Sequence, residues 1–526
     1  TAASTTKAAA ATTAITTTKA AAVTTAASTT KAAVTTTAAS TAKSAVTTTV
    51  QTTSDAAVTT TSNVTQTDYS YKITDGKATL IEWKSKAADA VIPDTVEGCP
   101  MTAISSSAFG NVRKTLRSVR LPDSITVIPE GLFSGCSELK KAEIPETVTE
   151  IGNNAFSGCR ALFLDHLPSA LEKVGTNAFQ NIGMLRNLCL SPKVTYASGA
   201  FSTVNCIQRL YIPSDLQLSE CMFRDCGNLV YVCLTDSIEN YKLPAGMFSG
   251  CKNLRRFDWH GNWKTIPSSF FLNCTSLETE LPKEMTTIGE QAFCGCKKLG
   301  PEIRIPNGCV IGVRAFANCT GISEFRFAGS AGLSESCFSN TGITELNLPE
   351  KTAQIPAKAF MSCEQLTSVV FPASVRVIGS GAFSSCHALN ALEIPASVTE
   401  IGENAFSYCF ALETAGISDQ TVLTAVPAGM FTGCSALKNI TLPEQITVVK
   451  DNAFSGCSAL TGIQLPKNLT TIGAFAFKGS GLEKIVFPDT VKTLGDGCMA
   501  SCSKLTEIIL PAHITALPSG MAASCT

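Results

Sequence analysis

The sequence is poor in several features on which nucleic-acid-binding and membrane proteins depend. Charged residues make up only 16% of its 526 residues, and the formal net charge is −1. No basic run or arginine-rich face of the kind that binds nucleic acid is present. No apolar stretch approaches the roughly 20 residues that a membrane-spanning helix requires. The sequence therefore predicts no nucleic-acid partner and no membrane span in this chain.

Motifs of catalytic chemistry are also missing. The sequence contains no H-E-x-x-H, G-x-S-x-G, Walker A or G-x-G-x-x-G pattern, and its four histidines fall at unrelated places. Cys294 and Cys296 are a close pair, but no second pair or nearby histidine completes a metal site. We therefore predict a protein that is not an enzyme and has no catalytic residue, metal ligand or cofactor.

The first 67 residues lack glycine, proline and aromatic side chains, and consist mostly of threonine and alanine. Lysine recurs there every 12 residues, at positions 7, 19, 31 and 43. Because so few bulky apolar side chains cannot offset the loss of chain entropy on folding, residues 1–67 are predicted to be a disordered Thr/Ala-rich linker or stalk. The many hydroxyls also suit an O-glycosylated stalk, and a helical or fibrous role for the 12-residue repeat stays open.

The rest of the chain carries a repeat marked by phenylalanine, with steps of 22 to 25 residues. A fixed period of this size is typical of a solenoid, in which one supersecondary unit stacks on the next. The anchor positions are Phe109, Phe133, Phe156, Phe179, Phe201, Phe223, Phe248, Phe271, Phe293, Phe316, Phe338, Phe360, Phe383, Phe406, Phe431, Phe454 and Phe477, followed by Met499 and Ala522.

One clear unit shows how a coil of this solenoid is predicted to fold. Leu392 and Ile394 alternate as in a strand, which Pro395 ends because proline cannot donate to a ladder. A second short extended piece follows, and Phe406 and Cys409 then fit one face of a short helical turn. The unit between Phe271 and Phe293 is short, and its strand reads LETELP, which predicts a local disturbance of the ladder.

Cysteine is abundant, with 23 residues, but its placement argues against a disulfide framework. Side chains in one column of a solenoid point the same way, whereas a disulfide needs converging Cβ vectors. We therefore predict a buried thiol column in which cysteine acts as a small hydrophobe, with disulfides or a metal as alternatives. Fourteen cysteines stand three residues after an anchor and define the thiol column: Cys136, Cys159, Cys226, Cys251, Cys274, Cys296, Cys319, Cys363, Cys386, Cys409, Cys434, Cys457, Cys502 and Cys525.

Two segments carry a recognisable motif, IPETVTEIGNNAFSGC at 144–159 and IPASVTEIGENAFSYC at 394–409. They resemble the BspA-type, or treponemal-type, leucine-rich repeats of bacterial and protist surface proteins. The resemblance covers residues 100–526 closely and implies a β-rich solenoid of 22–25-residue coils with a parallel β-sheet and short helical turns. Proteins of this family are mostly secreted or surface-attached and several are linked to adhesion, so the resemblance implies an extracellular, secreted or cell-surface location.

The domain boundaries follow from changes in pattern. Residues 68–100 contain alternating apolar positions around Asp75-Gly76, a hairpin signal, and are predicted to form an N-terminal β cap. Residues 101–526 are predicted to be the BspA-type leucine-rich repeat solenoid. Because the chain starts at Thr1 without a methionine or signal sequence and stops after a cysteine, we expect a processed or excised piece of a longer product.

The exposed side of the predicted sheet is the candidate binding surface. In each strand, the residue just before the last two apolar positions and the residue between them face outward together. The central strands carry tyrosine and arginine there, which are enriched in interface hot spots, although an incidental surface stays an alternative. The candidate residues are Arg209, Tyr211, Tyr231 and Arg256, extended by the charges of Asp258, Arg304 and Arg326.

These observations predict a non-enzymatic extracellular recognition or adhesion protein. It would present a curved repeat surface to a protein or glycan partner on a host or neighbouring cell. One alternative is a structural subunit of a self-associating surface layer or filament. Another is a non-catalytic binding array of a larger enzyme assembly.

Overall fold

The computed structural model describes residues 62–65, 67–185, 188–213, 215–234, 243–259 and 263–525. The chain divides into two compact units, Thr1–Thr49 and Val50–Thr526, and every described residue belongs to the second. The expected linker at 1–67 therefore lies outside the described residues, except for Ser62–Thr65 and Thr67.

A five-stranded sheet closes the N-terminal side of the array. Its core is a hairpin whose turn residues Asp75 and Gly76 both have positive φ, 51° and 71°, as two-residue hairpins require. The sheet extends beyond the expected 68–100 because pairing on both edges satisfies the hairpin's backbone groups. In sheet order its strands are β1 (Ser62–Thr65), β2 (Tyr69–Thr74), β3 (Lys77–Trp83), β6 (Cys99–Ile104) and β5 (Thr95–Val96).

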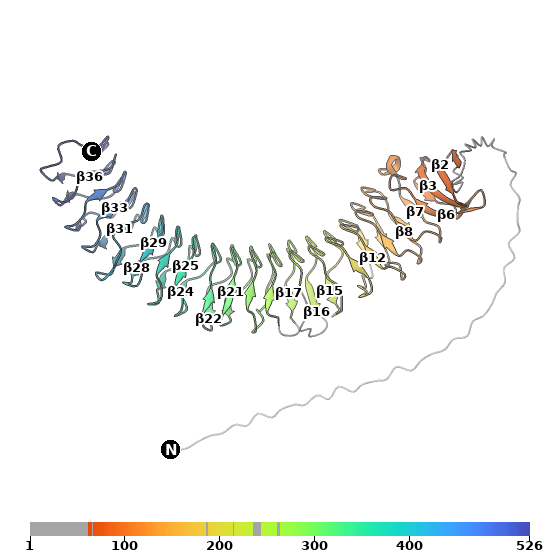
Figure 1. Cartoon of the computed structure of the whole chain (residues 1–526), viewed down its shortest axis with the longest axis horizontal. Helices are drawn as coiled ribbons and strands as arrows, with labels where there is room; N and C mark the ends of the chain where they lie inside the picture. The colour runs from red at the N-terminus through yellow and green to blue at the C-terminus, as the bar shows by residue number, and fades with distance from the viewer. Residues whose placement is uncertain are drawn as a thin grey trace, which may run out of the picture. The chain divides into compact units, whose positions relative to one another are not determined.

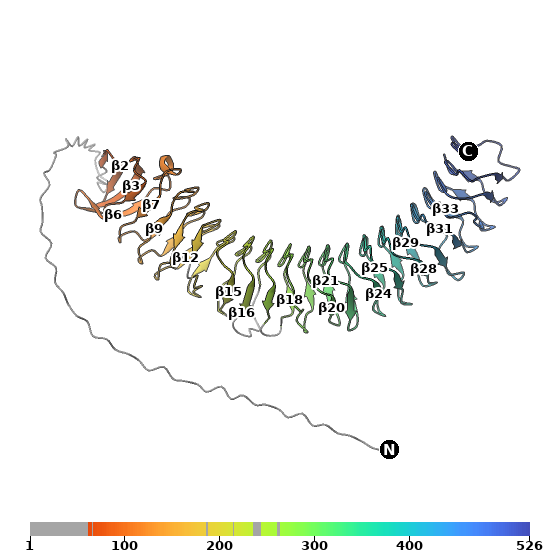
Figure 2. The same cartoon turned by 180° about the vertical axis from the view of Figure 1, so that it is seen from behind.

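The predicted parallel β-solenoid is confirmed, with about 18 turns and almost no helix. The coils lie side by side in chain order (Figures 1 and 2). The first ladder, here called the leucine ladder, consists of β4 (Asp89–Val91), β7 (Ser118–Arg120), β9 (Lys141–Glu143), β11 (Phe163–Leu164), β13 (Met184–Leu185), β15 (Arg209–Ile212), β16 (Tyr231–Leu234), β17 (Arg256–Asp258), β20 (Glu302–Ile305), β22 (Glu324–Phe327), β24 (Glu345–Asn347), β26 (Ser368–Val370), β28 (Ala391–Ile394), β30 (Thr414–Ile417), β32 (Asn439–Thr441), β35 (Lys484–Val486) and β37 (Glu507–Ile509).

A second ladder of shorter strands follows the leucine strand in most coils. Its inward residue is usually isoleucine or valine, and in eight of its fifteen strands the next residue is a glycine, which lets two coils approach closely. At Gly402, for example, a Cβ atom would lie 2.3 Å from the backbone nitrogen of Ser380 in the preceding coil. The strands are β8 (Val127–Ile128), β10 (Glu150–Ile151), β12 (Lys173–Val174), β14 (Thr195–Tyr196), β18 (Thr265–Ile266), β19 (Thr287–Ile288), β21 (Cys309–Ile311), β23 (Ala331–Gly332), β25 (Gln354–Ile355), β27 (Val377–Ile378), β29 (Glu400–Ile401), β31 (Ala425–Val426), β33 (Val448–Val449), β34 (Thr471–Ile472) and β36 (Thr493–Leu494).

Each coil then turns around its anchor residue, and these stacked turns are here called the turn column. In each coil from Phe133 to Met499, the anchor and the residues two before and two after it donate backbone N–H groups to the next coil. Phe133 N donates to Ala155 O at 2.8 Å, and the same bond recurs as far as Met499 N to Met521 O, also 2.8 Å. All three bonds point the same way, unlike the alternating bonds of a β-ladder.

Each turn has a left-handed residue at both ends. From Phe133 onward, the residues two before and two after each anchor have positive φ, such as Asn154 at 54° and Gly158 at 79°, whereas the three residues between them do not. From Phe133 onward the expected short helical turn is therefore absent: Cys136 N still donates to Phe133 O at 3.0 Å, but a left-handed residue cannot continue a right-handed helix.

Among the described residues the only helix is the 3-10 segment η1 (Gly110–Val112), which is far shorter than a helical bilayer span.

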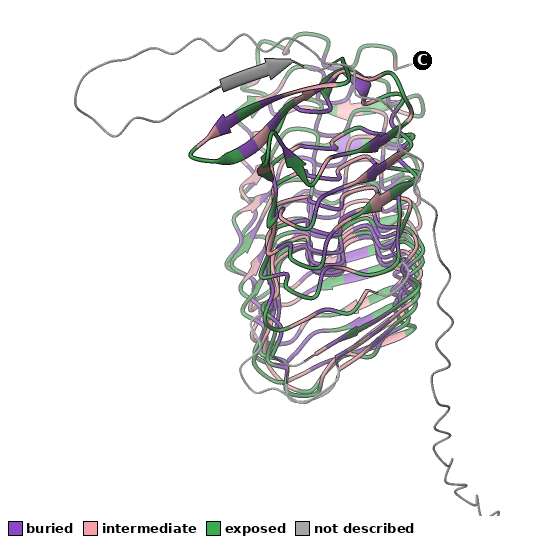
Figure 3. Ribbon diagram, turned by 90° about the vertical axis from the view of Figure 1, so that its right-hand side faces the viewer, coloured by how far each residue is buried: buried purple, intermediate pink, exposed green. Residues whose placement is uncertain are grey.

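The core is a continuous column of aromatic rings inside the coils. Neighbouring anchor rings from Phe109 to Phe477 have centroids 5.1 to 6.3 Å apart, and the column extends into the cap through Trp83, 6.2 Å from Phe109. Buried residues fill the interior of the coils and exposed residues lie outside (Figure 3). Each buried phenylalanine contributes about 1.5–3 kcal/mol to stability, and the buried leucine, isoleucine and valine side chains around the stack contribute on the same scale.

The thiol column lies beside this stack and has a defined hydrogen-bonding role. From Cys159 to Cys525, each thiol donates to the anchor carbonyl of the preceding coil, at 3.0 to 3.4 Å. Nine of these thirteen carbonyls also accept a backbone N–H from their own coil, so both of their lone pairs are used. All fourteen cysteines are free, and all but the half-buried Cys525 are buried. Burial raises the pKa of Cys136 and of Cys363 to about 11.

Candidate functional site

Five of the predicted binding residues come together on three adjacent strands, β15, β16 and β17. The register places Arg209, Tyr231 and Arg256 in one row across the strands, while Leu210, Val232 and Phe257 point into the core. The next outward row contains Tyr211, Cys233 and Asp258. Because neighbouring strands lie about 4.8 Å apart, these side chains form one patch, here called the Tyr/Arg face.

Asp258 organises one side of the Tyr/Arg face. Its carboxylate accepts the hydroxyl of Tyr231 at 2.6 Å and pairs with Nε of Arg256 at 2.5 Å. The hydrogen bond to Asp258 raises the pKa of Tyr231, and the same carboxylate raises the pKa of Arg256. These contacts hold the tyrosine ring and the guanidinium group in place before any partner arrives, which lowers the entropy lost on binding.

Arg209 and Tyr211 form the open side of the face. Tyr211 is 54% exposed, and its ring meets that of Tyr231 edge-on, with centroids 6.0 Å apart and an interplanar angle of 66°. Arg209 is exposed and makes no ion pair with any residue that the structure describes. A hollow of about 390 Å³ lies here, lined by Arg209, Tyr211, Val230, Tyr231, Arg255, Arg256 and Asp258.

The other two predicted residues, Arg304 and Arg326, lie on a separate two-stranded sheet. They face each other directly across β20 and β22. Glu302 pairs with Arg304 at 2.7 Å and with Arg326 at 3.2 Å, and Glu324 pairs with Arg326 at 2.8 Å. Both guanidinium groups therefore already have carboxylate partners, and they do not continue the Tyr/Arg face through hydrogen-bonded strands.

The gap between the two sheets is the coil that carries LETELP. Most coils have two residues between the first leucine and the next inward residue, but only Glu278 separates Leu277 from Thr279. The shortened segment forms no strand. Thr279 is buried, and its hydroxyl donates to Phe257 O at 3.0 Å and accepts from Trp259 Nε1 at 3.1 Å. The side chain thus replaces a hydrogen bond that a neighbouring strand would make.

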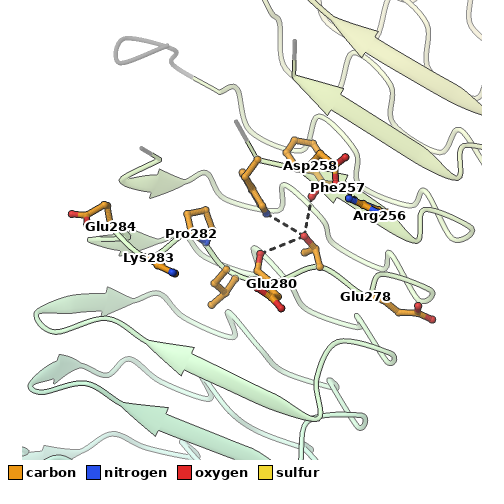
Figure 4. Close-up of a pocket in the computed structure, with 11 residues that line it drawn as sticks. Arg256, Phe257, Asp258, Glu278, Glu280, Pro282, Lys283 and Glu284 are labelled. Atoms are coloured by element: carbon orange, nitrogen blue, oxygen red, sulfur yellow. Dashed lines mark hydrogen bonds and ion pairs between the residues drawn. The ribbon is translucent and has the colours of Figure 1, made fainter. Parts of the chain in front are cut away.

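The broken ladder leaves a cavity of about 760 Å³ beside the Tyr/Arg face (Figure 4). The hydroxyl of Thr279 joins the end of β17 to the short coil. Figure 4 shows Glu278, Glu280 and Lys283 on that coil, beside Asp258 and Arg256 of β17. The sequence predicted the disturbance but not the cavity or its carboxylates. The missing residue after Leu277 is the signal that could have located them. The lining residues are Arg256, Phe257, Asp258, Trp259, Glu278, Thr279, Glu280, Leu281, Pro282, Lys283 and Glu284.

The tryptophans near this site serve packing. Trp259 packs on Phe257, with ring centroids 4.4 Å apart, and on Trp263 at 6.2 Å, and Trp263 is buried. Within the described ranges, no group of three or more His, Cys, Asp or Glu side chains is placed to hold a metal ion. The site offers an exposed aromatic ring, a free guanidinium and an acidic cavity, which together suit stacking and charge pairing.

Comparisons with solved structures give leucine-rich repeat proteins. A leucine-rich repeat protein from Bacteroides ovatus shares 22% identity over 88% of this chain and 95% of its own, with a TM-score of 0.32. A leucine-rich cell surface protein from Faecalibacterium prausnitzii shares 22% over 85% and 94%, with a TM-score of 0.26. A T. pallidum leucine-rich repeat protein shares 22% over 45% and 91%, with a TM-score of 0.27.

The comparison with curated proteins finds no match. The family model described as "BspA type Leucine rich repeat region (6 copies)" matches residues 102–230, 217–332, 300–413 and 424–526. These ranges include most of the solenoid, its anchor and thiol columns and the Tyr/Arg face. The chain belongs to the BspA-type leucine-rich repeat family.

Proposed function

We propose that this chain is a non-enzymatic extracellular recognition protein that binds a protein on a neighbouring cell surface through the Tyr/Arg face. The proposal depends mainly on two side chains of β15. Tyr211 is exposed and its ring meets that of Tyr231 edge-on, and Arg209 is neutralised by no carboxylate that the structure describes. Tyrosine and arginine dominate interface hot spots because each buries much area at modest entropic cost.

The charges around the face indicate which partner would fit. Arg209 offers a cation for a partner carboxylate, while Glu278, Glu280 and Glu284 line the adjacent cavity and would attract a basic side chain. A protein segment with an acidic and a basic residue a few positions apart would satisfy both regions. Leucine-rich repeat proteins typically bind proteins, which supports a protein partner over a small molecule.

A binding assay on intact cells tests this proposal. Fluorescent protein is titrated onto cultured epithelial and bacterial cells, with and without prior treatment of the cells with protease. We expect protease-sensitive binding that weakens tenfold or more in the double variant Tyr211→Ala/Tyr231→Ala, because hot-spot truncations cost about 2 kcal/mol or more.

The matched control is Thr441→Ala/Gln464→Ala, which changes outward positions on later coils and should leave binding unchanged. Equal binding by both double variants would show that the Tyr/Arg face is incidental surface. Binding that survives protease treatment but is lost after glycosidase treatment would instead favour a glycan partner.

A further inference from the structure

A cluster of exposed aromatic side chains lies on the outside of the turn column, away from the leucine ladder. Tyr408 follows its anchor by two residues and Phe410 by four, and they are 47% and 46% exposed. His387 occupies the position of Phe410 in the preceding coil, and its side chain is 37% exposed. Other coils place small, polar or charged residues at these two positions.

Tyr408 is held in a backbone conformation that tyrosine rarely adopts. Its φ is 58°, in the left-handed region, because the turn column requires this conformation two residues after every anchor. In the other coils from Phe133 onward, Gly, Asn, Asp, Ser or Thr occupies the position. Packing does not require an exposed ring here, and strained backbone that persists on a surface is typical of functional sites.

The rings are fixed by neighbouring coils on both sides. Tyr408 leans over Gly433 of the following coil, where an added Cβ would lie 2.6 Å from the ring carbon Cδ1. Phe410 stacks on His387, with centroids 4.8 Å apart and planes 23° from parallel. Tyr408 and Phe410 meet at 6.3 Å and 70°. The cluster therefore spans three coils, or about 10 Å at ~4.8 Å per coil.

A polar edge completes the cluster. The Oε1 atom of Glu364, one coil further back, lies 3.9 Å from Nδ1 of His387. A carboxylate and an imidazole offer a hydrogen-bond acceptor and a second donor or acceptor beside the rings. Aromatic faces next to such groups match a pyranose ring, whose C–H face stacks while its hydroxyls form hydrogen bonds.

We propose that Tyr408, Phe410, His387 and Glu364 form a glycan-binding site for one or two neutral pyranose units. The size of the cluster supports a sugar, because a stable protein interface buries about 800 Å² per partner and this platform is about 10 Å across. The carboxylate of Glu364 disfavours sialylated or sulfated sugars through like-charge repulsion. The site is separate from the Tyr/Arg face, so the proposal of a glycan site can be tested independently of the proposed protein partner.

The test is binding to a printed oligosaccharide array that carries neutral hexose and N-acetylhexosamine termini beside sialylated ones. The test variant is Tyr408→Asn/Phe410→Ser, which uses residues found at these positions in other coils, such as Asn318 with φ 62° and Ser435. The fold should therefore be retained, and a thermal melt of the variant checks this.

The chain offers a matched control in Phe475. This residue is also aromatic, 39% exposed and at positive φ (56°), and it leans over Gly497. It differs in having Lys478 Nζ 5.3 Å from its ring centroid instead of a second aromatic ring. Phe475→Asn should relieve the same backbone strain without touching the proposed site.

We expect wild type and Phe475→Asn to bind the same neutral glycans, and the double variant to bind them at least tenfold more weakly. Absence of any glycan signal for wild type, equal signals for wild type and a folded double variant, or a preference for sialylated glycans would each overturn the proposal.

Discussion

The turn column and the leucine ladder are two sides of the same coils, but only one of them is continuous. At the short LETELP coil the turn column is intact, with Phe271 N donating to Ala292 O at 2.8 Å. The leucine ladder has no strand in that coil, and β17 and β20 end in different sheets. The turn column thus maintains the solenoid, whereas the leucine ladder can lose a residue and open a cavity without disrupting the stack.

The difference has a physical basis. In the turn column, aromatic rings, thiols and three aligned hydrogen bonds per coil all contact the neighbouring coil. A change in one coil therefore alters the contacts of the next. On the outer side of the leucine ladder, side chains mainly meet water or an ion-pair partner such as Lys484 with Glu507, at 2.8 Å. Variation is therefore tolerated on the outer side, which is where recognition can evolve.

Raising the pH should produce the largest effect on the turn column. Burial raises the pKa of Cys136 and Cys363 from 9.0 to about 11. A thiol with a raised folded-state pKa gives its full stabilisation below pH 9 and loses it as pH rises toward 11. The loss is about 1.4 kcal/mol per pH unit for each such thiol. We expect cooperative unfolding in this window, measured by circular dichroism in the presence of a reductant.

The alkaline transition needs a control for thiol accessibility. At neutral pH, Ellman's reagent should react with the exposed Cys189 and leave the buried members of the thiol column unmodified. Rapid modification of many column thiols in the folded protein would contradict a sealed column. Stability that stays constant up to pH 11 would contradict the pKa argument.

Removing one ring from the stack should have the next largest effect. Phe293→Ala removes a fully buried side chain that stacks on Phe316 at 5.3 Å, and should destabilise the array by about 3–5 kcal/mol. The midpoint of urea unfolding measures the loss. Because a solenoid can unfold in parts, hydrogen exchange should show whether the coils around Phe293 open first. A loss below 1 kcal/mol would mean that the anchor rings stabilise the array much less than their burial implies.

Truncation on the outer side of the leucine ladder should have the smallest effect on stability. Tyr211→Ala removes a side chain that is 54% exposed, and should change stability by less than about 0.5 kcal/mol. The same urea titration provides the measurement. A loss comparable with that of Phe293→Ala would remove the distinction between the two sides of the coil, and a loss of binding by the Tyr211 variant could then be a folding defect.

Much of the fold was predictable from the sequence, because its signals repeat. The spacing of phenylalanine predicted the solenoid, and the position of cysteine three residues later predicted a column. The sequence LETELP predicted the disturbed coil, since one residue is missing between Leu277 and Thr279. These features depend on spacing along the chain and on the stacking of equivalent residues from successive coils. Both can be read without knowing the three-dimensional contacts.

Other features depended on contacts between coils. The expected helical turn became a turn with a left-handed residue at each end, and three of its N–H groups donate to the next coil instead of along a helix. Arg304 and Arg326 are neutralised by Glu302 and Glu324, whereas Arg209 has no such described partner, and composition alone cannot distinguish them.

Thus the sequence by itself determined the period, the stacked columns and the coil that is one residue short, because each of these is a spacing along the chain. Only the tertiary structure brought the carboxylate of Asp258 to within 2.6 Å of the hydroxyl of Tyr231. It likewise brought the ring centroids of Phe410 and His387 to 4.8 Å. Each of these contacts joins residues more than 20 positions apart, and their distances depend on the register between coils, which no local pattern specifies.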